Sequence, residues 1–234
     1  MINILCWLWH DPKCYAQYTA EHVNRWASMI RRNVTVPHRI SCVTDQPDGI
    51  DEGIAIIPLP DFPDVVNPNW PTSKGRPQCH RRIDMWRADA AETYGERFLM
   101  MDIDCAILGN IDHILSREED VVINGSSMSH RPYNGGMVLM TAGARPQVYD
   151  QWTPKRQVQA SKDHLGSDQA WYAEILGPDE AKFRKHDGVV YYRRFRPVWD
   201  QTKILFFNGS TKPWNYHRHG IDRVIEAYYP EGRP

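Results

Sequence analysis

Several features are scarce in this chain of 234 residues, and each scarcity excludes a class of protein. No window approaches the roughly 18 consecutive apolar residues of a membrane-spanning helix, so no span is expected. The formal net charge is −1, which gives no broad basic field for nucleic acid or a membrane surface. There is no internal repeat and no low-complexity segment. The length suits one large α/β domain or two small ones with a buried core.

The cysteines are few, odd in number and far apart. They are Cys6, Cys14, Cys42, Cys79 and Cys105, and no two form a Cys-x-x-Cys pair. This pattern predicts free thiols in a reducing compartment, neither a disulfide framework nor a zinc site. The N-terminal sequence MINILCWLWHDP has no positively charged segment before its apolar run, so no signal peptide is expected. The expected location is the cytoplasm.

The stretch from Arg97 to Asp112, RFLMMDIDCAILGNID, organises the rest of the chain. Its apolar residues 98–101 predict a buried strand, at whose end Asp102 and Asp104 flank Ile103. Alternate residues of an extended backbone face the same side, so the two carboxylates converge. At the carboxyl edge of an α/β sheet, such a pair indicates a divalent cation that also holds a diphosphate. The alternative is a turn residue and a solvated loop acid, which is the more common meaning of an isolated Asp-x-Asp.

The N-terminal pattern is β-α-β-β. The expected elements are strands at 2–9, 39–43 and 53–58 and a helix at 15–32. This order indicates a mostly parallel sheet with a nucleotide at its carboxyl edge. The loop after the first strand would lie against the base, with Trp7, Trp9 and His10 as candidate contacts, although Trp7 fits the core equally well.

The middle of the chain contains a long aperiodic segment, 59–77, rich in Pro, Asn and Asp. A loop of this length in a compact domain suggests a lid or an acceptor-side segment. The helix expected at 79–94 starts with Arg81 and Arg82, which could reach a phosphate or form a solvated helix end. The later expected elements are a short helix at 107–115 capped by Asn110, strands at 120–123, 137–140, 189–192 and 203–207, a basic linker at 155–156, and helices at 143–152, 164–176 and 221–228.

Polar residues stand at the ends of several of these elements. Asn134 and Gly136, within the sequence YNGGM, allow a close backbone approach or form a tight turn. Asp168 and Gln169 fall in the first turn after the expected N-cap Ser167, where an acid could also complement the helix dipole.

A second polar loop follows the last expected strand. In the sequence NGSTKPW, Gly209 and Lys212 form a compact loop that could place an ammonium group on a phosphate.

Four motifs occur in a fixed order: the strand ending in Asp-x-Asp, YNGGM, Ser-Asp-Gln at the start of a helix, and FFNGSTKPW at 206–214. In this order and spacing the chain resembles the GT-A fold glycosyltransferases of family eight, which include glycogenin and bacterial lipopolysaccharide galactosyltransferases. The match covers about residues 76–214, and the first strand and helix agree in pattern only. The resemblance implies one GT-A domain over 1–234, with a nucleotide-binding half (1–105), an acceptor and donor-sugar half (106–234), and a mostly parallel central sheet flanked by helices.

The resemblance also implies an activity. Family members transfer a hexose with retention of configuration from a nucleotide diphosphate sugar, most often a UDP-sugar, to an acceptor hydroxyl, with manganese or magnesium. The donor would be contacted by residues at matching positions: Asp102, Ile103 and Asp104 at the metal, diphosphate and ribose, Arg82 near phosphate and sugar, Asn134 and Gly136 against the sugar, and Gly209 and Lys212 at the leaving diphosphate. Asp168 would bind sugar hydroxyls, and Gln169 would lie beneath the anomeric carbon. Because Gln169 is an amide, attack from the same face as the leaving group is expected.

One position departs from the family pattern. The late motif usually begins with a histidine that is a third protein ligand of the metal, and Phe206 stands at that position. The amide oxygen of Asn208 could replace it, or His217 or His219 could fold back. Otherwise two carboxylates and the diphosphate would hold the ion, with weaker binding.

Two other functional classes remain open on the sequence alone. A nucleotidyltransferase also pairs acids on an α/β sheet, but no Gly-rich phosphate loop lies near the N-terminus, where His10-Asp11-Pro12 stands. A catalytically weak or inactive sugar- or nucleotide-binding protein would fit Phe206. The expected partners are a nucleotide-sugar donor and a carbohydrate or other hydroxyl acceptor. The polar C-terminus has no basic amphipathic helix, which favours a soluble enzyme.

Overall fold

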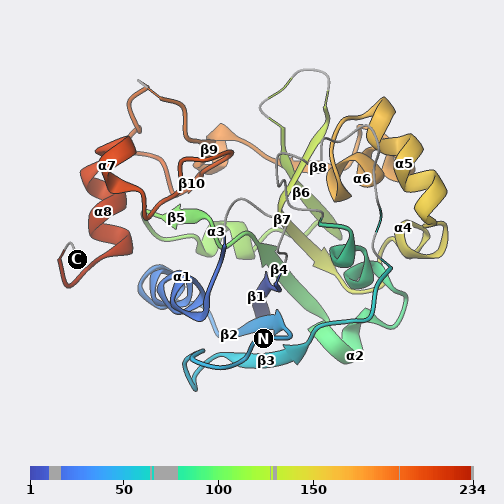
Figure 1. Cartoon of the computed structure of the whole chain (residues 1–234), viewed down its shortest axis with the longest axis horizontal. Helices are drawn as coiled ribbons and strands as arrows, with labels where there is room; N and C mark the ends of the chain where they lie inside the picture. Colours follow the sequence, from blue (N-terminus) through green and yellow to red (C-terminus); the bar gives the residue numbers. More distant parts are fainter. Residues whose placement is uncertain are drawn as a thin grey trace.

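A seven-stranded sheet forms the centre of the computed structural model, which describes residues 1–10, 17–63, 65, 79–126, 128, 131–194 and 196–232 (Figure 1). The strand order is β3-β2-β1-β4-β7-β6-β8. The bounds are β1 (Ile2–Leu8), β2 (His38–Thr44), β3 (Ala55–Pro58), β4 (Arg97–Met101), β6 (Val121–Gly125), β7 (Tyr133–Thr141) and β8 (Ala181–Phe183). Neighbouring strands are parallel, except that β7 is antiparallel to β4 and β6. The predicted mostly parallel sheet is confirmed.

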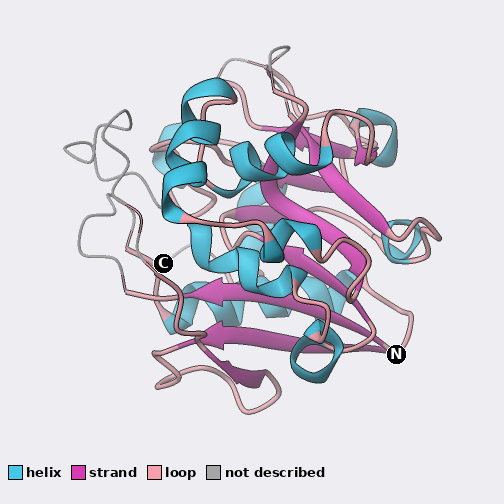
Figure 2. Ribbon diagram, turned by 90° about the vertical axis from the view of Figure 1, so that its right-hand side faces the viewer, coloured by secondary structure: helices cyan, strands magenta, loops and turns pink. Residues whose placement is uncertain are grey.

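The two faces of this sheet each carry a hydrophobic core. Along β1, Ile4 and Cys6 belong to one buried cluster, whereas Leu5 and Trp7 belong to the other. Because both faces of the strand are covered, its sequence is continuously apolar instead of alternating. Figure 2 shows the strands side by side with helices packed against them.

The helices divide between these two cores. Their bounds are α1 (Ala20–Asn33), α2 (Ala90–Tyr94), α3 (Asp112–Leu115), α4 (Gln147–Asp150), α5 (Pro154–Asp163), α6 (Asp168–Leu176), α7 (Tyr216–His219) and α8 (Asp222–Tyr228), with 3₁₀ helices η2 (Cys79–Trp86) and η3 (Lys185–Asp187). In Figure 1, α1 and α8 lie on one side of the sheet, and α4, α5 and α6 on the other. Within the described ranges, no helix is long and apolar enough to cross a bilayer.

A second, three-stranded sheet connects the acid pair with the late part of the chain. It consists of β5 (Cys105–Ile107), β10 (Ile204–Phe206) and β9 (Val189–Tyr191), with β10 in the middle. Phe206 lies opposite Cys105 on the antiparallel side and opposite Tyr191 on the parallel side. Because Cys105 directly follows Asp104, this sheet brings the segment after β10 to the acid pair.

Several expected elements have different bounds in the structure. The helix expected at 79–94 is broken into η2 and α2, and the spacing of three between Ile83 and Trp86 fits the 3₁₀ repeat. The stretch expected as a helix at 107–115 begins as strand β5, and only Asp112–Leu115 is helical. The helix expected at 143–152 is reduced to α4.

The structure differs most clearly from the sequence-based prediction in the segment after α4. Residues 155–156, expected as a basic linker, belong to the helix α5, which continues to Asp163. Thr153 caps this helix, because its side chain accepts a hydrogen bond from the Arg156 amide at 3.2 Å, and Pro154 occupies the first turn. The aperiodic segment 59–77 lies mostly outside the described residues.

Candidate active site

The acid pair lies where β4 ends beside the start of β7. The Asp102 amide donates a hydrogen bond to the Gly136 carbonyl at 2.8 Å, which extends the pairing of the two strands. The Phe207 amide donates to the Asp104 carbonyl at 3.1 Å. The polar residues expected at separate strand ends therefore meet at one edge of the sheet.

Arg82 joins two of the predicted carboxylates. Its guanidinium forms an ion pair with Asp102, donates to the Gly135 carbonyl at 3.1 Å, and lies 3.6 Å from Oδ2 of Asp168. The Asp168 side chain is 1% exposed and that of Asp102 is 26% exposed. The buried Asp168 thus holds the arginine, and the arginine holds the more exposed Asp102.

The paired glycines are required by these carboxylates. A Cβ atom on Gly135 would lie 2.7 Å from both carboxylate oxygens of Asp168, and one on Gly136 would lie 2.8 Å from Oδ2 of Asp102. Real Cβ contacts are not this short. The Asn134 side chain also lies against this part of β7, since its Oδ1 accepts a hydrogen bond from the Gly136 amide at 2.8 Å. The predicted close backbone approach therefore occurs, and it is made to the acids of the protein itself.

Asp104 has a different set of partners. Its Oδ2 forms an ion pair with Lys212 and accepts a hydrogen bond from the Tyr18 hydroxyl at 3.0 Å. The Lys212 side chain is 6% exposed. The loop after β10 thus brings an ammonium group to the acid pair, and the contact of Lys212 with a phosphate stays a prediction.

Burial and charge determine the protonation of this cluster. Burial raises the pKa of Asp102 to about 6, and Arg82 opposes this rise. Burial also raises the pKa of Asp168, again opposed by Arg82. Burial alone would lower the pKa of Arg82, but the surrounding charges, Asp102 first, hold it well above the usual value. The arginine therefore stays charged, and Asp102 is ionised at neutral pH.

The donor set fits a divalent cation only in part. Three carboxylates face two cations, Arg82 and Lys212, so one negative charge is in excess before a diphosphate adds more. Such an excess suits a hard cation with oxygen ligands. Among the described residues, however, no three His, Cys, Asp or Glu side chains are arranged to hold a metal ion. A cation would need oxygen atoms from the donor and from water.

Two of the three expected replacements for the missing histidine, His217 and His219, pack elsewhere. Phe206 is buried, and Asn208 is exposed in the loop that follows it. Nε2 of His219 lies 2.9 Å from the Pro213 carbonyl, and its ring packs 5.4 Å from that of Phe207. His217 is exposed and packs on Tyr216. Neither histidine is folded back onto the acid pair in this structure.

The other predicted residues lie around the cluster. Gln169 is half-buried, and its side chain lies against Gly166. Its backbone amide donates a hydrogen bond to Oδ1 of Asp168 at 2.9 Å. Gly209 is exposed, with a φ of 88° that favours glycine. Ile103 is buried.

The aromatic residues at the end of β1 differ in exposure. Trp7 is 4% exposed and packs against Trp9 and Tyr94, as its core interpretation expects. Trp9 is half-buried and His10 is exposed, so these two have surface for a ligand.

No family model and no curated protein matches this chain. Solved structures do match. The galactosyltransferase LgtC, in a complex with donor and acceptor sugar analogues, is 13% identical over 97% of this chain and 95% of its own, with a TM-score of 0.59. The glycosyltransferase GlyE of Streptococcus pneumoniae TIGR4 is 11% identical over 92% of this chain, with a TM-score of 0.58. The bifunctional glycosyltransferase WbbM is 11% identical over 97% of this chain, with a TM-score of 0.57. The chain has the fold of these glycosyltransferases. It matches only 57% of the length of GlyE and 49% of WbbM.

The predicted GT-A architecture is therefore confirmed. Within this GT-A fold, sequence reasoning missed Tyr18, which was expected only as part of a helix face. Its partner Asp104 lies 86 residues away, and no local pattern marks the pairing. It also missed Gly135 as the residue that makes room for Asp168, although the paired glycines were the signal that indicated a close approach.

Proposed function

We propose that this chain is a glycosyltransferase that moves a sugar from a nucleotide diphosphate sugar, with UDP as the expected nucleotide, to an acceptor hydroxyl with retention of configuration. The observation that carries the proposal is the pairing of two acids with two cations at the edge of a glycosyltransferase fold. Asp102 pairs with Arg82, and Asp104 pairs with Lys212. Charges of both signs fixed at one place suit a reaction that separates charge.

The cations would stabilise the leaving group. As the bond between sugar and phosphate breaks, negative charge grows on the β-phosphate. Lys212 and Arg82 are held in place by carboxylates and would need little reorganisation to interact with that charge. A manganese or magnesium ion held by Asp102 and Asp104, with Asn208 as a further candidate ligand, would supply additional neutralisation of the diphosphate when bound.

The position of Asp168 favours attack from the front face. A double displacement needs a carboxylate that reaches the anomeric carbon, but Asp168 is 1% exposed and lies behind Gly135. Gln169, its neighbour, carries an amide that cannot act as a strong nucleophile. The acceptor oxygen would therefore form its bond to the anomeric carbon on the side from which the diphosphate leaves, and its proton would pass to the departing phosphate oxygen.

Hydrolysis of the donor without an acceptor tests this proposal. The chain is incubated with UDP-linked and GDP-linked hexoses, with and without manganese, and the released nucleoside diphosphate is measured. We expect slow hydrolysis of one donor, and a loss of about 100-fold or more in Asp104→Asn. Asp150→Asn, which changes an exposed acid on α4, is the matched control. Full activity of Asp104→Asn would contradict the proposal.

The same assay separates the rival classes. A nucleotidyltransferase would release pyrophosphate, and a binding protein would bind the nucleotide without releasing any product. Gln169→Ala should bind the donor nearly as the wild type does and should lower the rate. A Gln169→Ala variant with an unchanged rate would remove this residue from the catalytic assignment.

A further inference from the structure

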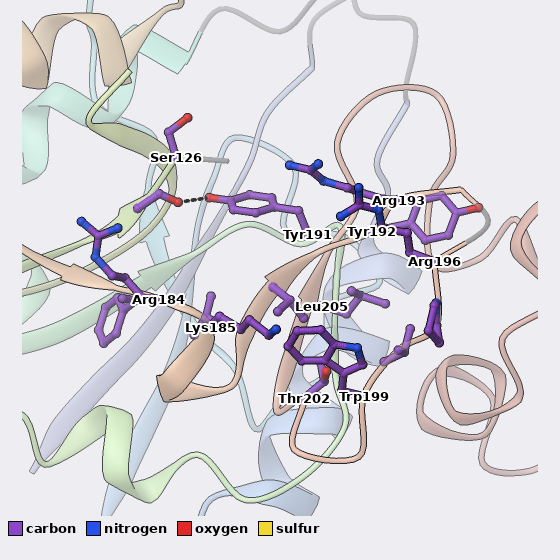
Figure 3. A pocket seen from close by; sticks show the side chains of 16 residues that line it. Ser126, Arg184, Lys185, Tyr191, Tyr192, Arg193, Arg196, Trp199, Thr202 and Leu205 are labelled. Carbon is purple, nitrogen blue, oxygen red and sulfur yellow. Dashed lines mark hydrogen bonds between the residues drawn. The ribbon is translucent and has the colours of Figure 1, made fainter. Parts of the chain in front are cut away.

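A cavity of about 450 Å³ lies beside the second sheet, outside the acid cluster (Figure 3). It is formed by the end of β6, the segment after β8, strand β9 and the chain that follows β9. Its volume is in the range of sites that hold small ligands. We call it the arginine pocket, because its cations are Arg184, Lys185, Arg193 and Arg196.

The arginine pocket has charge of one sign. Its described lining contains four cations and no aspartate or glutamate. In the described part of the chain, Arg184 and Arg196 take part in no ion pair, and Lys185 lies over the ring of Trp199. Cations gathered in a chain of net charge −1 repel one another and attract an anion.

The pocket also has aromatic walls. The ring of Tyr192 stacks on that of Phe207, with 4.9 Å between the ring centroids. Trp199 is 44% exposed, which is unusual for so large an apolar side chain. The hydroxyl of Tyr191 donates to the Gly125 carbonyl at 2.8 Å, which fixes this ring across the pocket (Figure 3). Rigid aromatic faces next to arginines suit a ligand that combines a ring with a negative charge.

The pocket adjoins the acid cluster through the chain itself. Tyr192 stacks on Phe207, and the Phe207 amide donates to the Asp104 carbonyl. Tyr191 lies opposite Phe206, which in turn lies opposite Cys105, so two strand spacings of about 4.8 Å separate the pocket wall from the residue after Asp104. A ligand in this pocket would lie next to a donor bound at the acids.

We propose that the arginine pocket binds the acceptor, and that the acceptor is a carbohydrate carrying a phosphate or carboxylate group. This inference rests on the proposed function. One of the two arginines at the opposite ends of the pocket, Arg184 or Arg196, binds the anion (Figure 3). Tyr192 and Trp199 contact the sugar ring, and a free hydroxyl points to the donor. In the reaction that hydroxyl loses its proton to the leaving phosphate oxygen and forms the new bond to the anomeric carbon, while the anionic group remains unchanged.

Binding of probe sugars tests the pocket independently of turnover. Calorimetry compares glucose 6-phosphate, glucuronate, inorganic phosphate and neutral glucose on the wild type. We expect one of the two charged sugars to bind at least tenfold more tightly than glucose and more tightly than inorganic phosphate. Equal binding of glucose, or of phosphate alone, would contradict an anionic carbohydrate as the ligand.

Variants then locate the binding. Arg184→Gln/Arg196→Gln should weaken binding of the charged sugar at least tenfold, whereas Arg31→Gln, an exposed arginine on α1, should not. All three substitutions are at exposed or weakly paired side chains, and thermal melting checks that the variants are folded. Unchanged binding in the double variant would overturn the assignment.

The donor assay distinguishes this inference from the proposed function. The double variant should hydrolyse the donor at the wild-type rate without an acceptor, and should lose transfer to the charged sugar. If hydrolysis were lost as well, or if UDP displaced the charged sugar, the pocket would belong to the donor and the acceptor assignment would be wrong. If the wild type showed no hydrolysis but bound the charged sugar, the proposed function would fail, and the pocket would be a carbohydrate-binding site without an acceptor role.

Discussion

Single glycines determine how closely the acids can approach the backbone. At Gly136 an added Cβ would lie 2.8 Å from both Asp102 and Asn134. We therefore expect Gly136→Ala to displace Asp102 and to weaken donor binding at least about tenfold, because charged groups in a fixed site tolerate little displacement.

The matched control is Gly109→Ala. The three atoms nearest to its Cβ would all belong to the flexible side chain of Lys203, the first at 3.3 Å, so binding should stay close to the wild type. Donor affinity of both variants is measured by calorimetry. Wild-type affinity in Gly136→Ala would show that the position of Asp102 is not critical.

His80 makes a prediction about stability at acid pH. Burial lowers its pKa to about 4, from the usual value of about 6.5 for histidine. Between these values the unfolded chain binds a proton that the folded chain does not, so the free energy of unfolding falls as the pH decreases. Over pH 7 to 4 this group should account for about 3 kcal/mol.

Urea unfolding of the wild type and His80→Gln at several pH values checks this. The difference between the two free energies of unfolding should change by about that amount across the window. A constant difference would mean that the pKa of His80 is the same in the folded and the unfolded chain.

At this scale the sequence indicated much of the site. Asp102 and Asp104 were predicted from their place after a strand, and Lys212 from the loop after the last strand. The structure brings the three together, and their contacts with a donor stay predictions. Tyr18 lies just before α1 and donates a hydrogen bond to Asp104. This contact was not predicted, because it joins residues that are distant in the sequence. Patterns within a few residues carry no information about such pairs.

Among the elements, α5 supports the helix that carries Asp168. The side chain of Gln157 accepts from the Trp152 indole at 3.1 Å and donates to Ser161 at 3.1 Å and to the Ser167 carbonyl at 3.0 Å. Gln157→Leu would leave these buried groups without partners. We expect a loss of about 2 kcal/mol in the free energy of unfolding.

Gln159→Leu, on the exposed face of α5, is the control and should change stability by less than about 0.5 kcal/mol. Chemical denaturation of both variants gives the comparison. Equal stability of the two variants would show that the Gln157 network does not hold α5 against α6.

The elements that sequence reasoning missed share a physical cause. β5 and β8 are three residues long, and each becomes a strand only through its partner, β10 or β6. Such short segments have no periodicity of their own. The helix α5 was missed for another reason. Thr153 and Pro154 are ordinary signals for a helix start, but the charged residues that follow them also fit a linker.

For the whole molecule, the free thiols report on its integrity. Cys6, Cys42 and Cys105 are fully buried, and burial raises the pKa of Cys6 and Cys105. In a variant with Cys14→Ser and Cys79→Ser, these thiols should react with Ellman's reagent only as fast as the chain opens. Reaction within seconds in native buffer would contradict a stable core around β1.

The central claim is that the acid pair binds a nucleoside diphosphate. The most direct measurement is thermal-shift binding of UDP and GDP, each with and without manganese, on the wild type, Asp102→Ala and the control Asp150→Asn. The account predicts stabilisation by one nucleotide that increases with manganese, is lost in Asp102→Ala and persists in Asp150→Asn. No shift with either nucleotide, or an equal shift in Asp102→Ala, would contradict it.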